Sequence, residues 1–187
     1  MTDFTPYHAP EPARTRIVLE TERLVLRRPE PRDFEAFRSF MHSERAEFVR
    51  MPGAPEENMT WRAFCHIMGM WEMRGYGLSM VCRKGQDQAL GGIGPWHPIT
   101  WPEREIGWSI YDPAIEGTGI AREAAEAVRA WAYNTLGWTT AVSYIDPANA
   151  GSIRLAERLG CTVDEAAEKP DGEPCLVYRH PAPEALT

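Results

Sequence analysis

Two alternating glycines, Gly117 and Gly119, stand between a β-prone run and an alanine-rich helical pattern, and this arrangement constrains the fold more than any other stretch. Glycines at alternate positions let the backbone turn sharply and approach a ligand closely. The first amides of the following helix have no intrahelical acceptor and carry the positive end of the helix dipole. The stretch therefore predicts an anion site with phosphate as its natural ligand.

The same pattern also occurs in ordinary strand-to-helix loops, and that interpretation stays open at this point. The established phosphate motifs do not apply. A P-loop ends in Gly-Lys-Ser or Gly-Lys-Thr, whereas Gly119 is followed by Ile120 and Ala121. A dinucleotide-binding fold needs a third glycine near Arg122 and an acidic strand end further along the chain.

Composition narrows the class of protein. The chain has 187 residues, of which 43% are hydrophobic and 25% charged, as expected for one globular domain with a core of its own. The formal net charge of -7 argues against nucleic-acid binding and fits a cationic or amine substrate. A polyanionic ligand would have to be held by local amides and a few arginines.

The four cysteines and the apolar runs indicate the compartment. The cysteines are scattered without C-x-x-C or histidine spacing, which predicts reduced thiols and no metal site. No apolar run is long enough to span a bilayer, and the N-terminus lacks a secretion signal. We therefore expect a cytoplasmic protein that binds no membrane.

Periodicity predicts one α/β (α+β mixed) domain over residues 17–180, with a flexible tail at 1–16 and a C-terminal tail at 181–187. Asp33 is placed to cap the first helix, and the methionines and aromatics of 59–73 predict a buried stripe or, alternatively, the wall of an apolar pocket. The helices are expected after Asp33 and at 59–73, 121–132 and 149–159, and the strands at 24–26, 78–82, 89–93, 105–111, 139–145, 161–163 and 175–178.

Three blocks in this order resemble the GCN5-related N-acetyltransferase (GNAT) superfamily, in the branch of the ribosomal-protein N-terminal acetyltransferases. Residues 19–27 resemble the branch's opening strand, residues 105–110 followed by 117–124 its cofactor block, and residues 149–161 its second helix. The resemblance covers nearly the whole chain. It implies a mostly antiparallel central sheet with one splayed parallel strand pair, flanked by helices.

The resemblance also implies the chemistry, which is direct transfer of an acetyl group from acetyl-coenzyme A to a primary amine, without metal or covalent enzyme intermediate. Free backbone amides beside the splayed strand would polarise the thioester carbonyl, and the amides at the helix start would cradle the pyrophosphate. Asn149 would contact the pantetheine arm, although it also fits a plain helix cap, and Ser152 lies in the same first turn. The implied cofactor-binding residues are Ser109, Ile110, Tyr111, Gly117, Thr118, Gly119, Ile120, Ala121, Arg122, Asn149 and Ser152.

The chain departs from the family pattern in two places. Glu116 replaces a large aromatic and Thr118 replaces a basic residue, so we expect modest cofactor affinity. Ala156 stands where many relatives carry a tyrosine as general acid, which leaves Ser152, Tyr144 or water to protonate the leaving thiolate.

Arg154 and Arg158, at i and i+4, are expected to be solvated and paired with Glu157 or a neighbour, with phosphate contact as the alternative.

Glu105 is the candidate general base. Alternation along the strand places Glu105, Gly107 and Ser109 on one face, where small residues leave room for an acceptor. Glu103 is the second choice. A surface ion pair with Arg104 is the alternative role for Glu105.

The acceptor stays open between a protein N-terminus and a small-molecule amine. A coenzyme A-binding sensor or inactive partner without turnover is the main rival function, and a phosphate-binding module unrelated to acetyl transfer is a further one. A homodimer is expected by analogy with such folds.

Overall fold

The computed structural model describes residues 16–49, 53, 55–170 and 175–186. The predicted N-terminal tail lies outside this set except for Arg16, and so does the turn at 171–174. The eight strands are β1 (Ile17–Glu20), β2 (Leu24–Arg27), β3 (Ser79–Arg83), β4 (Gly91–Trp96), β5 (Glu105–Ile110), β6 (Val142–Ile145), β7 (Thr162–Val163) and β8 (Leu176–Arg179). The four α-helices are α1 (Phe34–Met41), α2 (Glu57–Arg74), α3 (Ile120–Asn134) and α4 (Ala150–Arg158).

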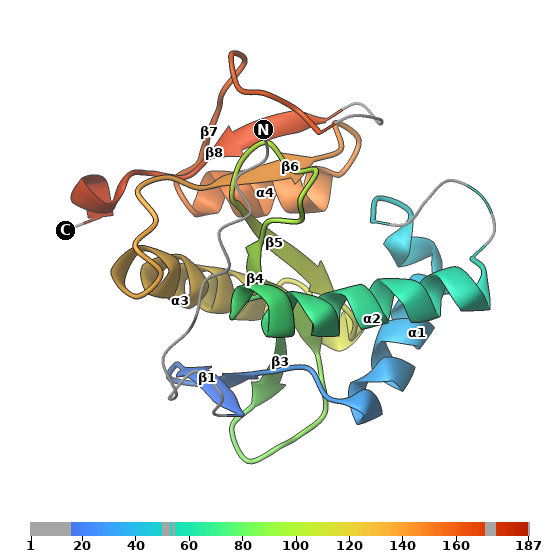
Figure 1. Cartoon of the computed structure of the whole chain (residues 1–187). Coiled ribbons are helices and arrows are strands. Elements are labelled where there is room, and N and C mark those ends of the chain that lie inside the picture. The colour runs from blue at the N-terminus through green and yellow to red at the C-terminus, as the bar shows by residue number, and fades with distance from the viewer. Residues whose placement is uncertain (1–15, 50–52, 54, 171–174, 187) are drawn as a thin grey trace.

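The described strands form one sheet in the order β1-β2-β3-β4-β5-β6-β8-β7 (Figure 1). The neighbours β5 and β6 are parallel, and the other neighbouring strands pair antiparallel. This arrangement confirms the predicted mixed α/β single domain with one parallel strand pair.

The opening block differs from its prediction. Residues 19–27 do not form one strand, because the chain turns at Thr21, whose amide donates to Leu24 O at 3.0 Å, and returns as β2 beside β1. The polar run Thr21-Glu22-Arg23 forms this turn. β1 is an edge strand with exposed or half-buried side chains, so it lacks the apolar pattern that would have predicted it.

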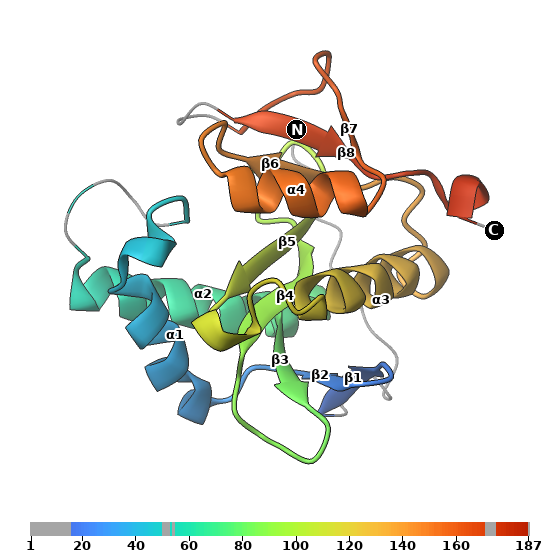
Figure 2. The same ribbon diagram turned by 180° about the vertical axis from the view of Figure 1, so that it is seen from behind.

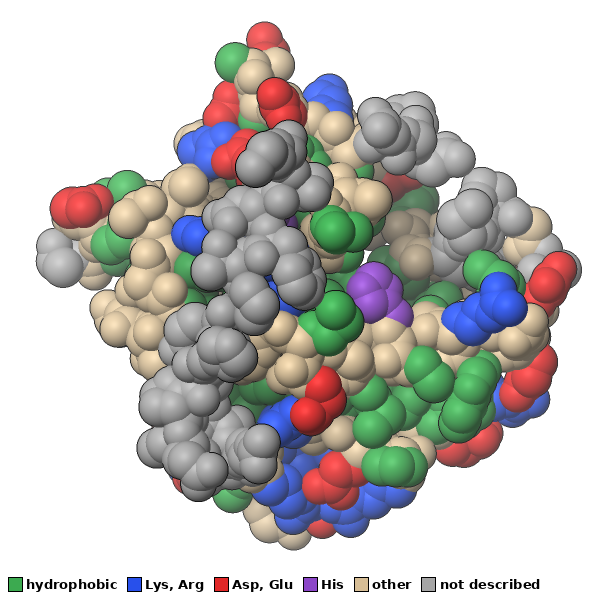
Figure 3. All heavy atoms as spheres, in the orientation of Figure 1, with side chains coloured by type: hydrophobic (Ala, Val, Ile, Leu, Met, Phe, Trp, Pro, Cys, Tyr) green, Lys and Arg blue, Asp and Glu red, His purple; other side chains and the backbone are tan. Residues whose placement is uncertain are grey.

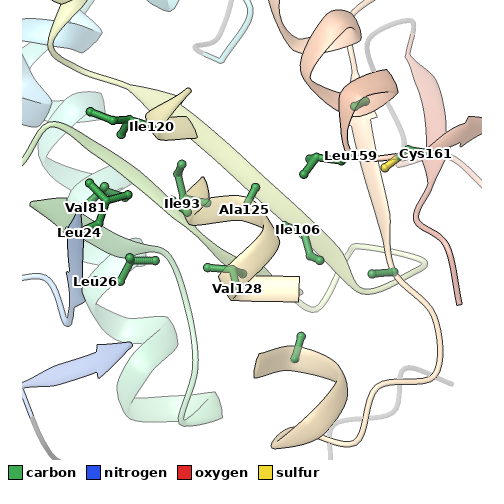
Figure 4. Close-up of a cluster of buried hydrophobic side chains, with 14 of the residues drawn as sticks. Leu24, Leu26, Val81, Ile93, Ile106, Ile120, Ala125, Val128, Leu159 and Cys161 are labelled. Carbon is green, nitrogen blue, oxygen red and sulfur yellow. The ribbon is translucent and has the colours of Figure 1, made fainter. Parts of the chain in front are cut away.

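The helices cover both faces of the sheet. Figures 1 and 2, viewed from opposite sides, place α1 and α2 over one face and α3 and α4 over the other. Adjacent residues of β3 confirm this division, since Val81 packs in the cluster that contains α3 while Met80 packs with α1 and α2. Figure 4 shows the first cluster, where Ile93 and Ile106 of the central strands meet Ala125 and Val128 of α3.

Helix α2 is only partly buried. Phe64, Ile67 and Met70 lie in the interior, as predicted for a buried stripe. Met59 and Trp61, by contrast, are 46% and 54% exposed. Figure 3 shows apolar side chains at the surface along this helix. The prediction of core packing therefore holds for one face of α2 and is wrong for the other.

Asp33 precedes α1 as predicted, but its side chain does not cap that helix. The carboxylate accepts hydrogen bonds from Arg27 Nη1 and Nη2 at 2.7 and 2.6 Å and from the Glu30 amide at 2.8 Å. Both charged side chains are buried, so each requires the other as a partner. Because the Asp33 carboxylate binds the buried guanidinium of Arg27, it does not cap α1.

At the C-terminus, the predicted tail contains the short 3-10 helix η5 (Pro183–Leu186), and Pro181 O accepts a bond from Tyr133 Oη at 2.9 Å. Within the described part of the chain, no helix is long and apolar enough to cross a bilayer.

Two glycine substitutions test this packing. A Cβ on Gly94 of β4 would lie 2.2 Å from Gly77 O and 2.8 Å from Leu78 Cα, whereas a Cβ on Gly69 of α2 would meet no described neighbour within 4 Å. We expect Gly94→Ala to lower the free energy of unfolding by about 1 to 3 kcal/mol because backbone must move. Gly69→Ala should raise it by about 0.5 to 1 kcal/mol through helix propensity. Urea unfolding followed by circular dichroism measures both, and equal stabilities would contradict the described contact.

Candidate active site

The strands β5 and β6 separate soon after they meet. Their registered pair is Glu105 with Val142, supported by the Val142 amide bond to Arg104 O at 3.0 Å. One residue further on, the bridge is a side chain, because Ser143 Oγ donates to Ile106 O at 2.7 Å. Beyond it the two strands diverge, which opens the sheet between its halves.

A buried serine-histidine pair supports the point of divergence. Since the Ser143 hydroxyl donates to Ile106 O, His180 Nε2 donates to Ser143 Oγ across 3.0 Å. Burial lowers the pKa of His180 to about 3, so the imidazole is neutral, and its buried Nδ1 has no hydrogen-bond partner among the described residues. Both side chains are buried and hold the strands at this point.

Among Ser109, Ile110 and Tyr111, the Ile110 amide is the one directed into the gap between β5 and β6. Tyr111 N donates to Leu90 O at 2.8 Å, so the neighbouring pair Gly91 with Ile110 is a non-hydrogen-bonded pair of the β4–β5 ladder. The Ile110 amide therefore points away from β4, toward β6. The amides of Ser109 and Tyr111 are directed to β4.

A cavity of about 710 Å³ lies along this gap and reaches the start of α3. Four arginines line it, which concentrates positive charge on a chain of net charge -7. They are Arg45, Arg122, Arg154 and Arg158.

The glycine loop borders the same cavity. Gly117 and Gly119 have φ of 73° and 81°, in the left-handed region that favours glycine. A Cβ on Gly117 would meet no described atom within 4 Å, and one on Gly119 would meet only Arg23 Nη2 at 3.6 Å. The first bond of α3 runs from Glu123 N to Gly119 O, so the amides of residues 120–122 have no intrahelical acceptor.

The side chains around this loop have different surroundings. Ala121 and Arg122 line the cavity, whereas Ile120 is buried in the core. Thr118 turns its hydroxyl to Ile115 O at 2.6 Å and is absent from the lining. The place of Thr118 in the motif predicted a hydroxyl beside the phosphates. In the structure that hydroxyl does not face the cavity.

Arg45 neutralises Glu116, the carboxylate that stands where the family pattern has a large aromatic residue. Its guanidinium donates to Glu116 Oε1 from Nε at 2.9 Å and also from Nη2. The same group donates to Ile110 O at 2.9 Å and Tyr111 O at 2.8 Å. Arg45 thus ties the end of β5 to the residue that precedes the glycine loop.

The start of α4 borders the cavity from the other side. Asn149 Oδ1 accepts from the Ser152 amide at 3.0 Å, as a helix cap does. Ser152 Oγ accepts from Trp108 Nε1 at 3.0 Å, which leaves the hydroxyl proton of Ser152 free to donate. Ala156, at the family's tyrosine position, is fully buried in the core.

Arg154 and Arg158 form no ion pair with another described residue, so the predicted pair with Glu157 is not present. Their position on the cavity lining leaves both guanidinium groups available to an anion.

A second, smaller cavity of about 90 Å³ adjoins the first and contains Glu105. Figure 3 shows the surface hollowed in the region between α2 and β6. The residues shared by the two linings are Phe48, Val49, Trp108, Asn149 and Ser152. The two cavities therefore meet at the end of the parallel strand pair.

Glu105 is half-buried and carries a perturbed pKa. Burial raises the pKa of its carboxyl to about 7, while hydrogen bonds from the Trp101 indole and the Tyr144 amide act in the opposite direction. A Cβ on Gly107 would lie 3.6 Å from Glu105 Oε1, so these residues share a face as the alternation predicted. A carboxyl with a pKa near neutral in a cavity has the property that a general base needs.

The other candidates for acid and base differ in their surroundings. Glu103 accepts two bonds from Arg179, both at 2.8 Å, so its carboxylate is committed to an ion pair. Tyr144 lines the smaller cavity, and its buried hydroxyl meets no hydrogen-bond partner within the part of the chain that the structure describes. Burial raises the pKa of Tyr144 above its ordinary value. Arg104 forms no ion pair with Glu105 among the described residues, which removes the surface-pair interpretation.

Sequence reasoning missed three contributors. Arg45 and Trp101 reach the site from segments without a recognisable motif, whereas Arg23 lies in the opening block, and each acts through contacts distant in sequence or through loop geometry. Arg23 binds Thr118 O and the carboxylate of Glu123, which fixes the β1–β2 turn to the start of α3. The arginine of the opening block was a usable signal, because it belongs to one of the three blocks that carried the resemblance.

Comparison with known proteins agrees with this geometry. A family model described as the acetyltransferase (GNAT) domain matches residues 23–162, and the chain therefore belongs to that family. The crystal structure of the acetyltransferase from Agrobacterium tumefaciens str. C58 is similar, with 41% identity and a TM-score of 0.79 over 87% of this chain and 92% of that one. Uncharacterized protein YkkB of Bacillus subtilis (strain 168) is 28% identical over 173 residues, 89% of this chain and 95% of YkkB.

The predicted branch has weaker support. The ribosomal L7/L12 alpha-N-protein acetyltransferase RimL is 17% identical, with a TM-score of 0.66 over 88% of this chain and 92% of that chain. At this identity the likeness concerns the fold alone, so the ribosomal-protein branch stays a prediction. Among the residues that the structure places, no group of three or more metal-ligating side chains could hold a metal ion.

The raised pKa of Glu105 generates a prediction about stability. Because the folded protein keeps this proton up to about pH 7 while the unfolded chain loses it near its ordinary pKa of 4.5, stability falls as pH rises through that interval. Glu105→Gln removes the penalty, so the variant should be more stable than wild type above pH 8, by at most about 3 kcal/mol, and equal to it near pH 4.

Thermal unfolding between pH 4 and 9 measures this difference. Glu103→Gln is the control, because it removes charge from a carboxylate already paired with Arg179 and should not stabilise the protein. A pH-independent difference for Glu105→Gln would contradict the assigned burial.

Proposed function

We propose that this protein is an N-acetyltransferase that transfers the acetyl group of acetyl-coenzyme A directly to a primary amine. The observation that carries the proposal is the meeting of the two cavities at the split of β5 and β6. One cavity offers arginines, a glycine loop and the Ile110 amide, and the other offers the Glu105 carboxyl. GNAT acetyltransferases use acetyl-coenzyme A as co-substrate, and transfer to an amine is their general reaction.

The residues of the larger cavity fit this cofactor. The open side of Gly117 and Gly119 allows a pyrophosphate to approach the unpaired amides of α3, where the helix dipole favours an anion. Arg122, Arg154 and Arg158 supply charge for further phosphate groups. The neutralisation of Glu116 by Arg45 removes the repulsion expected from the sequence, which supports affinity higher than the departures had suggested.

When bound, acetyl-coenzyme A supplies an acyl group activated as a thioester. The Ile110 amide would donate to the acyl oxygen, where negative charge develops. Glu105 would accept a proton from the attacking amine, directly or through water, as the new C–N bond forms and the C–S bond breaks. Ser152, which has a free hydroxyl proton and borders both cavities, would protonate the leaving sulfur and be reprotonated by solvent.

Ser152 is preferred over Tyr144 as the acid for a geometric reason. Ser152 lines both cavities, whereas Tyr144 lines only the smaller one among these two. Water remains the third donor, because the larger cavity is open to solvent at the arginines. Substitution Ser152→Ala with normal turnover would assign the proton to Tyr144 or water.

The acceptor belongs to the class of primary amines, as a protein N-terminus or a small molecule. Consumption of acetyl-coenzyme A against peptides, polyamines and aminoglycosides distinguishes these classes. The rival function, a coenzyme A-binding sensor or inactive partner, requires cofactor binding without turnover on every amine. The free state of Cys65, Cys82, Cys161 and Cys175 supports the expected reducing, cytoplasmic location, and the homodimer stays a prediction.

Cofactor binding is tested by thermal stability. Acetyl-coenzyme A at a hundred times its Kd should stabilise the fold by about 2.7 kcal/mol, whereas NAD should not. Gly119→Ala should weaken the binding of acetyl-coenzyme A about tenfold or more, because a side chain would enter the phosphate's approach to α3. Gly137→Ala is the matched control, since Gly137 has a φ of 68° and lies outside the cavity lining. Equal loss of affinity in both variants would contradict the proposed cradle.

Base catalysis is tested separately. Glu105→Gln should lower turnover about a hundredfold or more while leaving the Kd for acetyl-coenzyme A nearly unchanged, because the carboxylate acts on the amine and not on the cofactor. Glu103→Gln should retain most activity. Wild-type turnover in Glu105→Gln would assign proton removal to Glu103 or solvent.

A further inference from the structure

Trp101 lies next to the candidate base and is not part of any motif of the chain. Its indole Nε1 donates to Glu105 Oε2 across 2.6 Å, from the loop that connects β4 with β5. Among the described residues, the Trp101 indole is the side-chain donor to Glu105, and the Tyr144 amide donates to the same carboxyl from the backbone. The second oxygen, Oε1, lies on the side of Gly107, where the missing side chain leaves space.

We propose that Trp101 is a positioning residue whose indole N–H holds one oxygen of Glu105 and so orients the carboxylate to accept the proton of the amine. This role rests on the proposed function of Glu105. It differs from a catalytic role, because the indole would touch neither the amine nor the thioester.

The loop that carries Trp101 is fixed on both sides, so the indole has a defined position. The Trp101 amide donates to Pro98 O at 3.0 Å, and its ring meets the Tyr144 ring edge to face with centroids 6.2 Å apart. Two residues further on, Glu103 is held by its two bonds to Arg179 of β8. A donor fixed in this way costs little reorganisation when the carboxyl changes its charge.

The other titratable side chains near Glu105 do not obscure the effect of a substitution at Trp101. The Tyr144 phenol on β6 and the Cys175 thiol before β8 both interact with Glu105, and burial raises the pKa of each, so both are neutral near pH 7. Asp146 lines the same cavity and binds the Ala148 amide. Removal of the indole N–H takes away a donor that favours the charged carboxylate, so the pKa of Glu105 must rise.

The first test is the pH dependence of kcat/KM for Trp101→Phe, which keeps an aromatic ring beside Tyr144 and removes the donor. We expect the limb that reports the base to move upward by about one pH unit, with the KM for acetyl-coenzyme A unchanged. Trp61→Phe, at an exposed position of α2, is the control and should leave the limb in place. An unchanged limb in Trp101→Phe would overturn the proposal.

The second test does not depend on turnover. In proton–nitrogen NMR spectra of the wild-type protein, the indole resonance of Trp101, identified by its loss in Trp101→Phe and by its shift in Glu105→Gln, should titrate with a midpoint near pH 7. In Glu105→Gln that titration should be absent. A resonance that does not respond between pH 5 and 9 contradicts the contact.

The two tests separate this inference from the proposed function. If the resonance titrates but no amine is acetylated, the proposed function fails, and the role in catalysis fails with it while the contact stands. If amines are acetylated but neither the resonance nor the pH limb moves as expected, only the role of Trp101 fails.

Discussion

The separation of β5 from β6 is the constraint on which the rest of the structure depends. A parallel pair that continued would bond the Ile110 amide to β6 and close the space between the strands. Here the registered pairing is confined to Glu105 and Val142, and the Ser143 hydroxyl takes over as the bridge to Ile106. The pairing therefore stops before β5 reaches the larger cavity, which Trp108, Ser109 and Ile110 line. Backbone polar groups of β5 are exposed there, where a ligand can bind them.

The charge distribution follows from the same opening. A chain with a net charge of -7 attracts an anion only if positive charge is concentrated locally. The structure gathers arginines from three regions of the chain around the larger cavity, and one of them, Arg45, also compensates Glu116. In the smaller cavity, burial instead raises the pKa of Glu105, so the two halves of the site present different electrostatic environments to their ligands.

Local patterns allowed most of the fold to be predicted. The left-handed glycines before α3, the Asn149 cap of α4 and the alternation of Glu105 with Gly107 depend on a few neighbouring residues, so sequence spacing is enough to indicate them. Strand β1 was not predicted as a separate strand, because an edge strand needs no apolar face. The prediction for α2 was wrong at Met59 and Trp61, which are exposed. The apolar character of a side chain does not by itself show whether another element packs over it.

The sequence alone determined the fold class, the glycine loop and the pair of candidate bases, because these follow from residue types at short spacing. Alternation ranked Glu105 ahead of Glu103, but it could not show what surrounds either carboxylate. The tertiary structure gives them different partners by bringing Arg179 to Glu103 from 76 residues away and the Trp101 indole to Glu105. It likewise brought Arg45 to Tyr111 O across 66 residues. Such contacts are set by the closure of the whole sheet, and no local spacing in the sequence encodes them.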